Sequence, residues 1–310
     1  MRGSEKALVA LGVLALVAAP FVFYPVFVMS MLCFALFACA FNLLLGYTGL
    51  LSFGHAAFFG GAAYFTAHSV KEWGLPPELG LIVGMIGAAL LGLVMGLLAI
   101  RRQGIYFAMV TLALSQMFFF FCLQAPFTHG EDGIQGVPRG HFLGLVDLYL
   151  PLNMYYFVLG VFLLGVFAIW RIVHSPFGMI LRSIRENEAR AISLGYGVGR
   201  YKLAAFVMSA ALAGLAGGLK ALVFQFATLT DVTWQMSGEV ILMTLLGGIG
   251  TMVGPIVGAG LVIALQNSLA TSQFPVTVVT GAIFMICVLV FRRGIVGEVI
   301  TLASRRRKDR

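Results

Sequence analysis

The amino-acid sequence predicts an all-α polytopic membrane protein, and three observations carry that prediction. Hydrophobic residues make up 60% of the 310 residues and charged residues only 10%, whereas about a quarter of the residues of a soluble protein are charged. The mean hydropathy is +1.00. Several apolar runs reach the roughly 20 residues that a helix needs to cross a bilayer, and they are too long and too continuously apolar for barrel strands.

Breaks in the apolar runs place about ten transmembrane helices. Pro20 and Pro25 separate the first two, and glycines separate the second from the third and the eighth from the ninth. Polar or charged loops separate the others. The expected helices cover residues 7–24, 26–46, 50–69, 79–100, 104–125, 152–173, 201–225, 237–249, 252–270 and 275–291.

Two points of this topology have alternatives. Residues 7–24 do not form an ordinary cleaved signal peptide, because Ala18-Ala19-Pro20 is a poor cleavage site and another span follows at once. Near the other end, an alternative has eight crossings, with Ser237–Leu265 as a re-entrant segment that enters and leaves through one face.

The placement of charge predicts the orientation. All Lys and Arg residues except Lys71, Arg139 and Lys220 fall on one side of the ten-span topology. Cytoplasmic loops carry the excess of positive charge, so we expect both termini to be cytoplasmic. The chain then forms a single transmembrane domain, 1–310, with a cytoplasmic loop at 174–200. Its basic tail at 292–310 is expected to attract anionic lipid of the bilayer, not nucleic acid.

The sequence offers no catalytic residues and no metal site. All four cysteines lie in apolar spans without C-x-x-C spacing, which is typical of small hydrophobic core residues. No G-x-x-x-x-G-K-[ST] loop is present, so we expect this chain to bind no cofactor and no ATP by the usual phosphate cradle. Lys220 is expected to reach the membrane interface, with a substrate or ion-pair role as the alternative. The spans lack buried carboxylates for proton coupling. Transport energy is therefore expected from elsewhere.

Two glycine-rich interruptions indicate a candidate translocation pathway. Both contain L-L-G-x-x-G, and broken helices at matching places in two halves are typical of substrate sites in carriers. Close helix packing through small residues is the alternative for each glycine. The candidate pathway residues are Gly46, Tyr47, Thr48, Gly49, Ser52, Gly54 and His55 in the first segment and Gly247, Gly248, Gly250 and Gly254 in the second.

The charged loop at 174–200 is expected to form one or two short amphipathic helices on the cytoplasmic face. Ser175 is a good N-cap, Pro176 suits the first helical position, and Gly195 is a typical stop. Phe177, Ile180, Leu181 and Ile184 form an apolar stripe, and Glu186 has Arg182 and Arg190 four residues away on either side. This mixture of charges suits a protein partner as well as lipid.

Several motifs together resemble the LivM-type permease subunit of branched-chain amino acid ABC importers. They are Gly46-Tyr47-Thr48-Gly49 with Ser52-Phe53-Gly54-His55, Gly104-Ile105-Tyr106-Phe107-Ala108, Glu131-Asp132-Gly133-Ile134-Gln135-Gly136 and Ser175-Pro176-Phe177-Gly178 with the residues up to Gly195. The resemblance covers about residues 25–295. It implies a multi-pass protein of the bacterial inner membrane that pairs with a LivH-type permease. Two cytoplasmic ABC ATPases, which hold ATP and Mg, and a periplasmic substrate-binding protein would complete the importer.

The resemblance also assigns an ATPase-coupling role to the cytoplasmic loop. The sequence departs from the E-A-A form of wider importer families, with Arg190 in the third place and Gly195 one residue late. The residues expected to couple to an ATPase are Ser175, Pro176, Phe177, Gly178, Arg182, Arg185, Glu186, Glu188, Ala189, Arg190 and Gly195.

The expected function is uptake of branched-chain, hydrophobic amino acids by alternating access, driven by partner ATPases. The binding protein would dock on the outer loops at 126–151 and 226–237. Alternatives are a permease for urea, short amides or sugars in a related ABC importer, and an ion-coupled secondary carrier.

Overall fold

The computed structural model describes residues 12–269, 281–282, 285 and 294–298. Most of the span expected at 275–291 and of the tail at 292–310 therefore lies outside the described residues. The helices are α2 (Pro25–Thr48), α3 (His55–Lys71), α4 (Pro77–Ala99), α5 (Ile105–Gln124), α6 (Pro151–Val173), α7 (Pro176–Glu186), α8 (Glu188–Ser193), α9 (Val198–Phe224), α10 (Trp234–Gly247) and α11 (Gly254–Leu269). A short apolar helix, Gly12–Phe21, precedes them and ends in the 3-10 turn η1 (Ala19–Phe21).

Five of the described helices, α2, α4, α5, α6 and α9, are long and apolar enough to cross a membrane. Helices α3 and α10 have 17 and 14 residues, which is shorter than the ~20 residues of a full span. For α11, the structure describes 16 residues, up to Leu269. The protein is thus an all-α membrane protein, and the count of ten spans stays a prediction. The expected start of the third helix at residue 50 is wrong, because Gly49 ends α2 at a φ of 75° and α3 begins only at His55.

Helices α2 and α9 form the centre of the bundle. Most of each is buried, whereas most of α4, α5 and α6 is not. Small residues allow α9 to approach its neighbours closely: the backbone of Phe59 on α3 lies where a methyl group on Gly217 would be, and Ala88 of α4 faces Gly214. Such small-residue contacts are typical of helix packing in membranes, where lipid supplies no hydrophobic drive between helices.

Helices α10 and α11 form an antiparallel pair. The Gly254 backbone lies against Gly247 at the turn, and Gly258 lies against the Met243 carbonyl one turn further on. Both alternatives for this region, two short spans or a re-entrant segment, contain such a hairpin.

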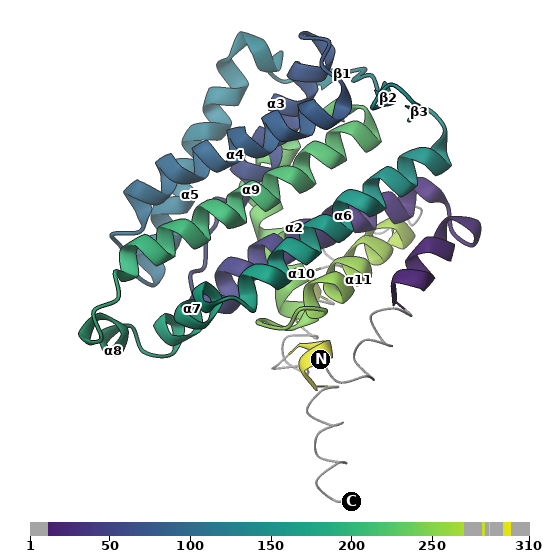
Figure 1. Ribbon diagram of the computed structural model, residues 1–310. Helices are drawn as coiled ribbons and strands as arrows, with labels where there is room; N and C mark the ends of the chain where they lie inside the picture. The colour runs from purple at the N-terminus through teal and green to yellow at the C-terminus, as the bar shows by residue number, and fades with distance from the viewer. Residues whose placement is uncertain (1–11, 270–280, 283–284, 286–293, 299–310) are drawn as a thin grey trace, which may run out of the picture.

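The two ends of the bundle differ (Figure 1). Helices α7 and α8 lie at one end, called the α7 end below. The short strands β1 (Ile134–Gln135), β2 (His141–Phe142) and β3 (Val146–Asp147) lie at the other, the strand end. There β1 pairs antiparallel with β4 (Phe226–Ala227), and β2 pairs with β3. The turns η2 (Pro126–Thr128) and η3 (Leu229–Val232) flank β1 and β4. The β1–β4 pair joins the two segments that were expected to form outer loops.

Candidate functional site

The two glycine-rich breaks lie against each other at the α7 end. A methyl group on Gly46, in the last turn of α2, would lie 2.8 Å from the Gly250 backbone nitrogen. Asn42, one turn earlier, links the segments: its side-chain nitrogen donates to the Thr251 carbonyl at 2.8 Å, and its side-chain oxygen accepts from the Gly250 N–H at 2.9 Å. Asn42 is 3% exposed within an apolar helix. A polar residue there was the sequence signal for this junction, and sequence reasoning missed it.

The backbone groups freed between α2 and α3 have protein partners. Ser237 of α10 donates to the Phe53 carbonyl at 2.7 Å and accepts from the Ala56 N–H at 2.9 Å. Thr111 of α5 accepts from the Phe53 N–H at 3.2 Å. These three hydrogen bonds therefore fasten the first break to α5 and α10, and they need no lipid or water.

The second break is a tight turn between α10 and α11. Gly250 has a φ of 77°, a conformation that favours glycine. Thr251 closes the turn, because its hydroxyl donates to the Gly248 carbonyl at 2.8 Å and accepts from the Gly254 N–H at 3.1 Å. Gly247 and Gly254 are in backbone contact. Close packing thus accounts for these glycines, and their place in a pathway stays a prediction.

A cavity of about 390 Å³ adjoins the first break. Its lining is mostly apolar and contains one of the candidate pathway residues, Gly49. The other lining residues are Leu50, Leu51, Phe53, Gly104, Ile105 and Ala108. Beside it, Tyr47 and Thr48 are buried in α2, and Ser52 and Gly54 are buried in the loop.

His55 lies inside an aromatic cluster and is fully buried. Its ring meets Phe41, Phe58 and Phe206 edge-on. Ser209 of α9 donates to the Ala40 carbonyl at 2.6 Å, so its oxygen accepts from His55 Nε2 at 2.9 Å. This arrangement places the proton of the neutral imidazole on Nε2. Its contacts tie α3 to α9 and α2.

The loop between α6 and α9 folds as two helices. The Ser175 hydroxyl accepts from the Gly178 N–H, which confirms the predicted N-cap of α7. Asn187, with a φ of −155°, ends α7 and caps α8 by accepting from the Arg190 N–H at 3.0 Å. Gly195 has a φ of 84° directly after α8, as expected of a helix stop.

The bend at Asn187 separates side chains that a continuous helix would pair. The expected pairing of Glu186 with Arg190 is wrong, because the two residues belong to different helices. The pairing of Glu186 with Arg182 does not form either: of the charged pairs in the described part of the chain, only Glu188–Lys202 and Asp231–Lys220 are ion pairs. Instead, the Arg182 guanidinium lies 5.2 Å from the centre of the Tyr47 ring.

The eleven expected coupling residues divide into two groups. Five contact the transmembrane part: Phe177 stacks near Tyr201, Gly178 packs on the Val173 carbonyl, Arg182 covers Tyr47, Arg185 donates to the Gly46 carbonyl and Glu188 binds Lys202 at 2.7 Å. The other six are Ser175, which caps α7, and the exposed residues Pro176, Glu186, Ala189, Arg190 and Gly195. Arg182 and Arg185 of the first group are exposed as well. Large apolar side chains are exposed beside them, namely Met179, Ile192, Leu194 and Tyr196.

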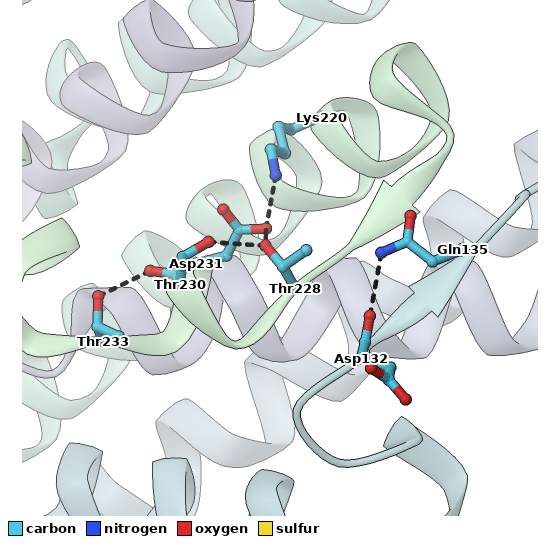
Figure 2. A network of polar contacts seen from close by, with 7 residues as sticks. All are labelled: Asp132, Gln135, Lys220, Thr228, Thr230, Asp231 and Thr233. Carbon is cyan, nitrogen blue, oxygen red and sulfur yellow. Dashed lines mark hydrogen bonds and ion pairs between the residues drawn. The ribbon is translucent and has the colours of Figure 1, made fainter.

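Lys220 forms a buried ion pair near the strand end (Figure 2). Its Nζ lies 2.6 Å from Asp231 Oδ2, with the two side chains 8% and 4% exposed. Thr228 donates weakly to the same carboxylate at 3.4 Å, and the Phe226 ring centre lies 4.5 Å from Nζ. The prediction that Lys220 reaches the interface is therefore wrong, and the alternative of an ion pair is confirmed. The reason is that η3 turns back into the bundle and packs against Gly60 of α3.

The two other basic residues at the strand end are bound to backbone. Lys71 donates to the Gln135 carbonyl at 2.8 Å, and Arg139 donates to the Val223 carbonyl at 2.7 Å. Burial lowers the pKa of the Arg139 guanidinium from its ordinary value. Both side chains fasten the segment between α5 and α6 to the bundle.

Metal-binding chemistry has no candidate residues in the described ranges. No three His, Cys, Asp or Glu side chains there are grouped so that they could hold a metal ion. Cys33, Cys39 and Cys122 are buried free thiols, and Cys287 lies outside the described residues.

The comparisons with known proteins agree on one family. The sequence model described as "Branched-chain amino acid transport system / permease component" matches residues 24–292. The chain is 30% identical over 251 residues to the high-affinity branched-chain amino acid transport system permease protein LivM of Escherichia coli (strain K12), which covers 73% of this chain and 59% of that protein. It is 29% identical, with the same coverage, to the LivM protein of Salmonella typhimurium.

A more distant similarity links the chain to a permease of another kind. It is 27% identical over 170 residues to the ribose import permease protein RbsC of Bacillus subtilis (strain 168), covering 52% of this chain and 50% of that protein. The chain spans about three fifths of the length of the two LivM proteins. No solved structure matches it.

Proposed function

Because the chain belongs to the family of branched-chain amino acid transport permease components, we propose that it is the transmembrane permease subunit of an ATP-driven importer. The substrates are branched-chain, hydrophobic amino acids, and transport proceeds by alternating access. The observation that carries the proposal is the junction at the α7 end, where α7 of a surface helix pair contacts both glycine-rich breaks.

The proposed topology has ten spans in the inner membrane of a bacterium, with both termini in the cytoplasm. The α7 end is then the cytoplasmic end. Charge supports this orientation, because Arg101 and Arg102 precede Gln103, which donates to Glu188 of α8, and the arginines of α7 and α8 lie at this end as well. The acidic residues Glu131, Asp132 and Asp147 belong to the segment at the strand end.

The partner that drives transport is a pair of cytoplasmic ABC ATPases, which hold ATP and Mg. The docking surface consists of the exposed apolar residues Met179, Ile192, Leu194 and Tyr196, flanked by Glu186 and Arg190. Four large apolar side chains exposed on α7, on α8 and directly after α8 are typical of a protein interface. The flanking charges supply the polar rim that such interfaces have.

The other proposed partners are a LivH-type permease, which forms a heterodimer with this chain, and a periplasmic binding protein. The binding protein docks at the strand end, on segments 126–151 and 226–237. The β1–β4 pair supports this assignment, because it makes one surface of the two segments. Movement of α7 and α8 rocks the helices around the first break, and the apolar cavity beside Gly49 suits an aliphatic side chain.

One experiment tests the docking surface. In the chain co-expressed with its ATPase subunits, L194E is expected to reduce co-purification of the ATPases, because a carboxylate would be buried in an apolar contact. Leu145 is also exposed but lies at the strand end, so L145E is the matched control and should leave co-purification unchanged. Equal co-purification with L194E and the native chain would reject this surface.

A second experiment tests the substrate. A deletion strain that carries the chain on a plasmid should take up leucine, and excess isoleucine or valine should compete. Urea and ribose are tested as competitors in parallel, because they are the substrates expected of the alternative permeases. Competition by ribose or urea, with none by isoleucine, would contradict the proposed substrate class.

A further inference from the structure

We propose that Arg185 is a positioning residue that transmits movement of α7 to both glycine-rich breaks, and that it makes no ATPase contact. This inference rests on the proposed function, because it requires that an ATPase moves α7. It reassigns a residue that the sequence resemblance places among the ATPase-coupling set.

The first observation is the contact with α2. Arg185 Nη1 donates to the Gly46 carbonyl. This carbonyl lies in the last turn of α2, where helix carbonyls lack partners within the helix. A guanidinium is also favoured at a helix C-terminus because of the negative end of the helix dipole. Arg185 thus forms a charge-assisted hydrogen bond that holds α7 to the end of a central helix.

The second observation is that the same guanidinium reaches the turn between α10 and α11. A methyl group on Gly250 would lie 3.3 Å from Arg185 Nη1 and 3.3 Å from the Gly46 carbonyl oxygen. Asn42 binds this turn through the Gly250 N–H and the Thr251 carbonyl. One arginine from α7 therefore meets both breaks at the point where Asn42 joins them.

The third observation is close packing on the side of Arg185 that faces α2, although the side chain as a whole is exposed. A methyl group on Gly49 would lie 3.3 Å from Arg185 Cγ, and one on Gly46 would lie 2.8 Å from the Gly250 nitrogen. Arg182, one turn earlier on α7, covers the Tyr47 ring. When α7 moves, it must therefore carry the end of α2 with it or break the bond to Gly46. Packed elements of this kind move between discrete arrangements and do not deform smoothly.

Arg190 provides a matched control within the same loop. It is the same residue type, it lies five positions along the chain on α8, and it is exposed. In the described structure its side chain takes part in no hydrogen bond or ion pair, unlike that of Arg185. An arginine-to-glutamine change thus removes a transmitting contact at Arg185 and a docking-surface charge at Arg190.

The test uses the complete importer in liposomes, with leucine uptake and ATP hydrolysis measured on the same sample. The ratio of leucine taken up to ATP hydrolysed does not depend on how much importer is assembled. We expect R185Q to bind the ATPases as the native chain does but to lower this ratio about tenfold, the factor that corresponds to one lost charge-assisted hydrogen bond. R190Q is expected to weaken ATPase binding and to leave the ratio unchanged.

R185K separates transmission from a general structural role. A lysine keeps one donor for the Gly46 carbonyl but lacks the planar fork that also lies against Gly250. We therefore expect a ratio between those of R185Q and the native chain. If R185Q is not recovered as monodisperse protein, R185K decides the question by the same ratio.

Two results would overturn the proposal. One is a native ratio in R185Q, or in R185K where R185Q is not recovered. The other is a loss of ATPase binding in R185Q as large as that in R190Q, which would make Arg185 a docking residue. A failure of the proposed function is distinct from both, because the native chain would then show no ATP-dependent leucine uptake.

Discussion

Replacing Lys220 by methionine is expected to be among the most destabilising single substitutions of a charged residue in this chain. The change removes the ammonium that lies 2.6 Å from Asp231 Oδ2. It leaves the carboxylate 4% exposed, with the Thr228 hydroxyl at 3.4 Å as its remaining side-chain donor. The Phe226 and Phe224 rings attract the ammonium through their faces but do not stabilise a carboxylate in this way.

The magnitude follows from the exposure of the charge left behind. Removing one partner of a buried ion pair costs about 3–5 kcal/mol, because the remaining charge is neither hydrated nor paired. Lys202 provides the comparison, since it pairs with Glu188 at 2.7 Å but Glu188 is 30% exposed. Water can hydrate Glu188 in K202M, so that variant is expected to lose about 1 kcal/mol or less.

The assay is thermal denaturation of the detergent-purified chain, followed by the fraction that stays monodisperse. K220M should lower the apparent melting temperature by at least about three times as much as K202M, in the ratio of the two energies. The double variant K220M/D231N should recover part of the loss, because it leaves no unpaired buried charge. Equal shifts in K220M and K202M would show that burial of the remaining carboxylate does not determine the loss of stability.

Two further predictions concern the glycine contacts and the junction. G217A should sharply reduce the yield of monodisperse protein, because the added methyl group would overlap the Phe59 carbonyl. G199A is the control, because the space around Gly199 is open, and it should leave the yield unchanged. Similar yields of the two variants would contradict the close approach of α9 to α3. N42A should leave the Gly250 N–H and the Thr251 carbonyl without a hydrogen-bond partner, and each unpaired group should cost about 1–3 kcal/mol of stability. Hydrogen–deuterium exchange should therefore become faster at residues 248–254, and unchanged protection there would count against the role of Asn42.

Local chemistry was enough to predict the ends of several elements. Ser175 and Gly195 were expected to start and end the surface helices, and both do so through contacts within a few residues of chain. The long apolar helices could also be predicted locally, because a run of about 20 apolar residues is by itself enough to favour a bilayer. The L-L-G-x-x-G repeat correctly marked two interrupted regions.

The contacts that build the junction could not be predicted in this way. Asn42 and Arg185 meet Gly250 and Gly46 only because α7, α2 and the α10–α11 turn come together in the folded chain. The sequence shows how far Lys220 lies from the end of its helix, which led to the wrong prediction that it reaches the interface. It does not show the inward turn of η3 that brings Asp231 to Lys220. Glu186 and Arg190 were expected to pair because nothing in their spacing shows the bend at Asn187.

We expect this chain to transport only when partner ATPases drive it. The most direct measurement is labelled leucine uptake into liposomes that contain the chain, with and without the ATPase subunits and the binding protein. Uptake should require the partners and ATP, and the chain alone should show none under a proton or sodium gradient. Accumulation of leucine by the chain alone under an ion gradient would contradict it.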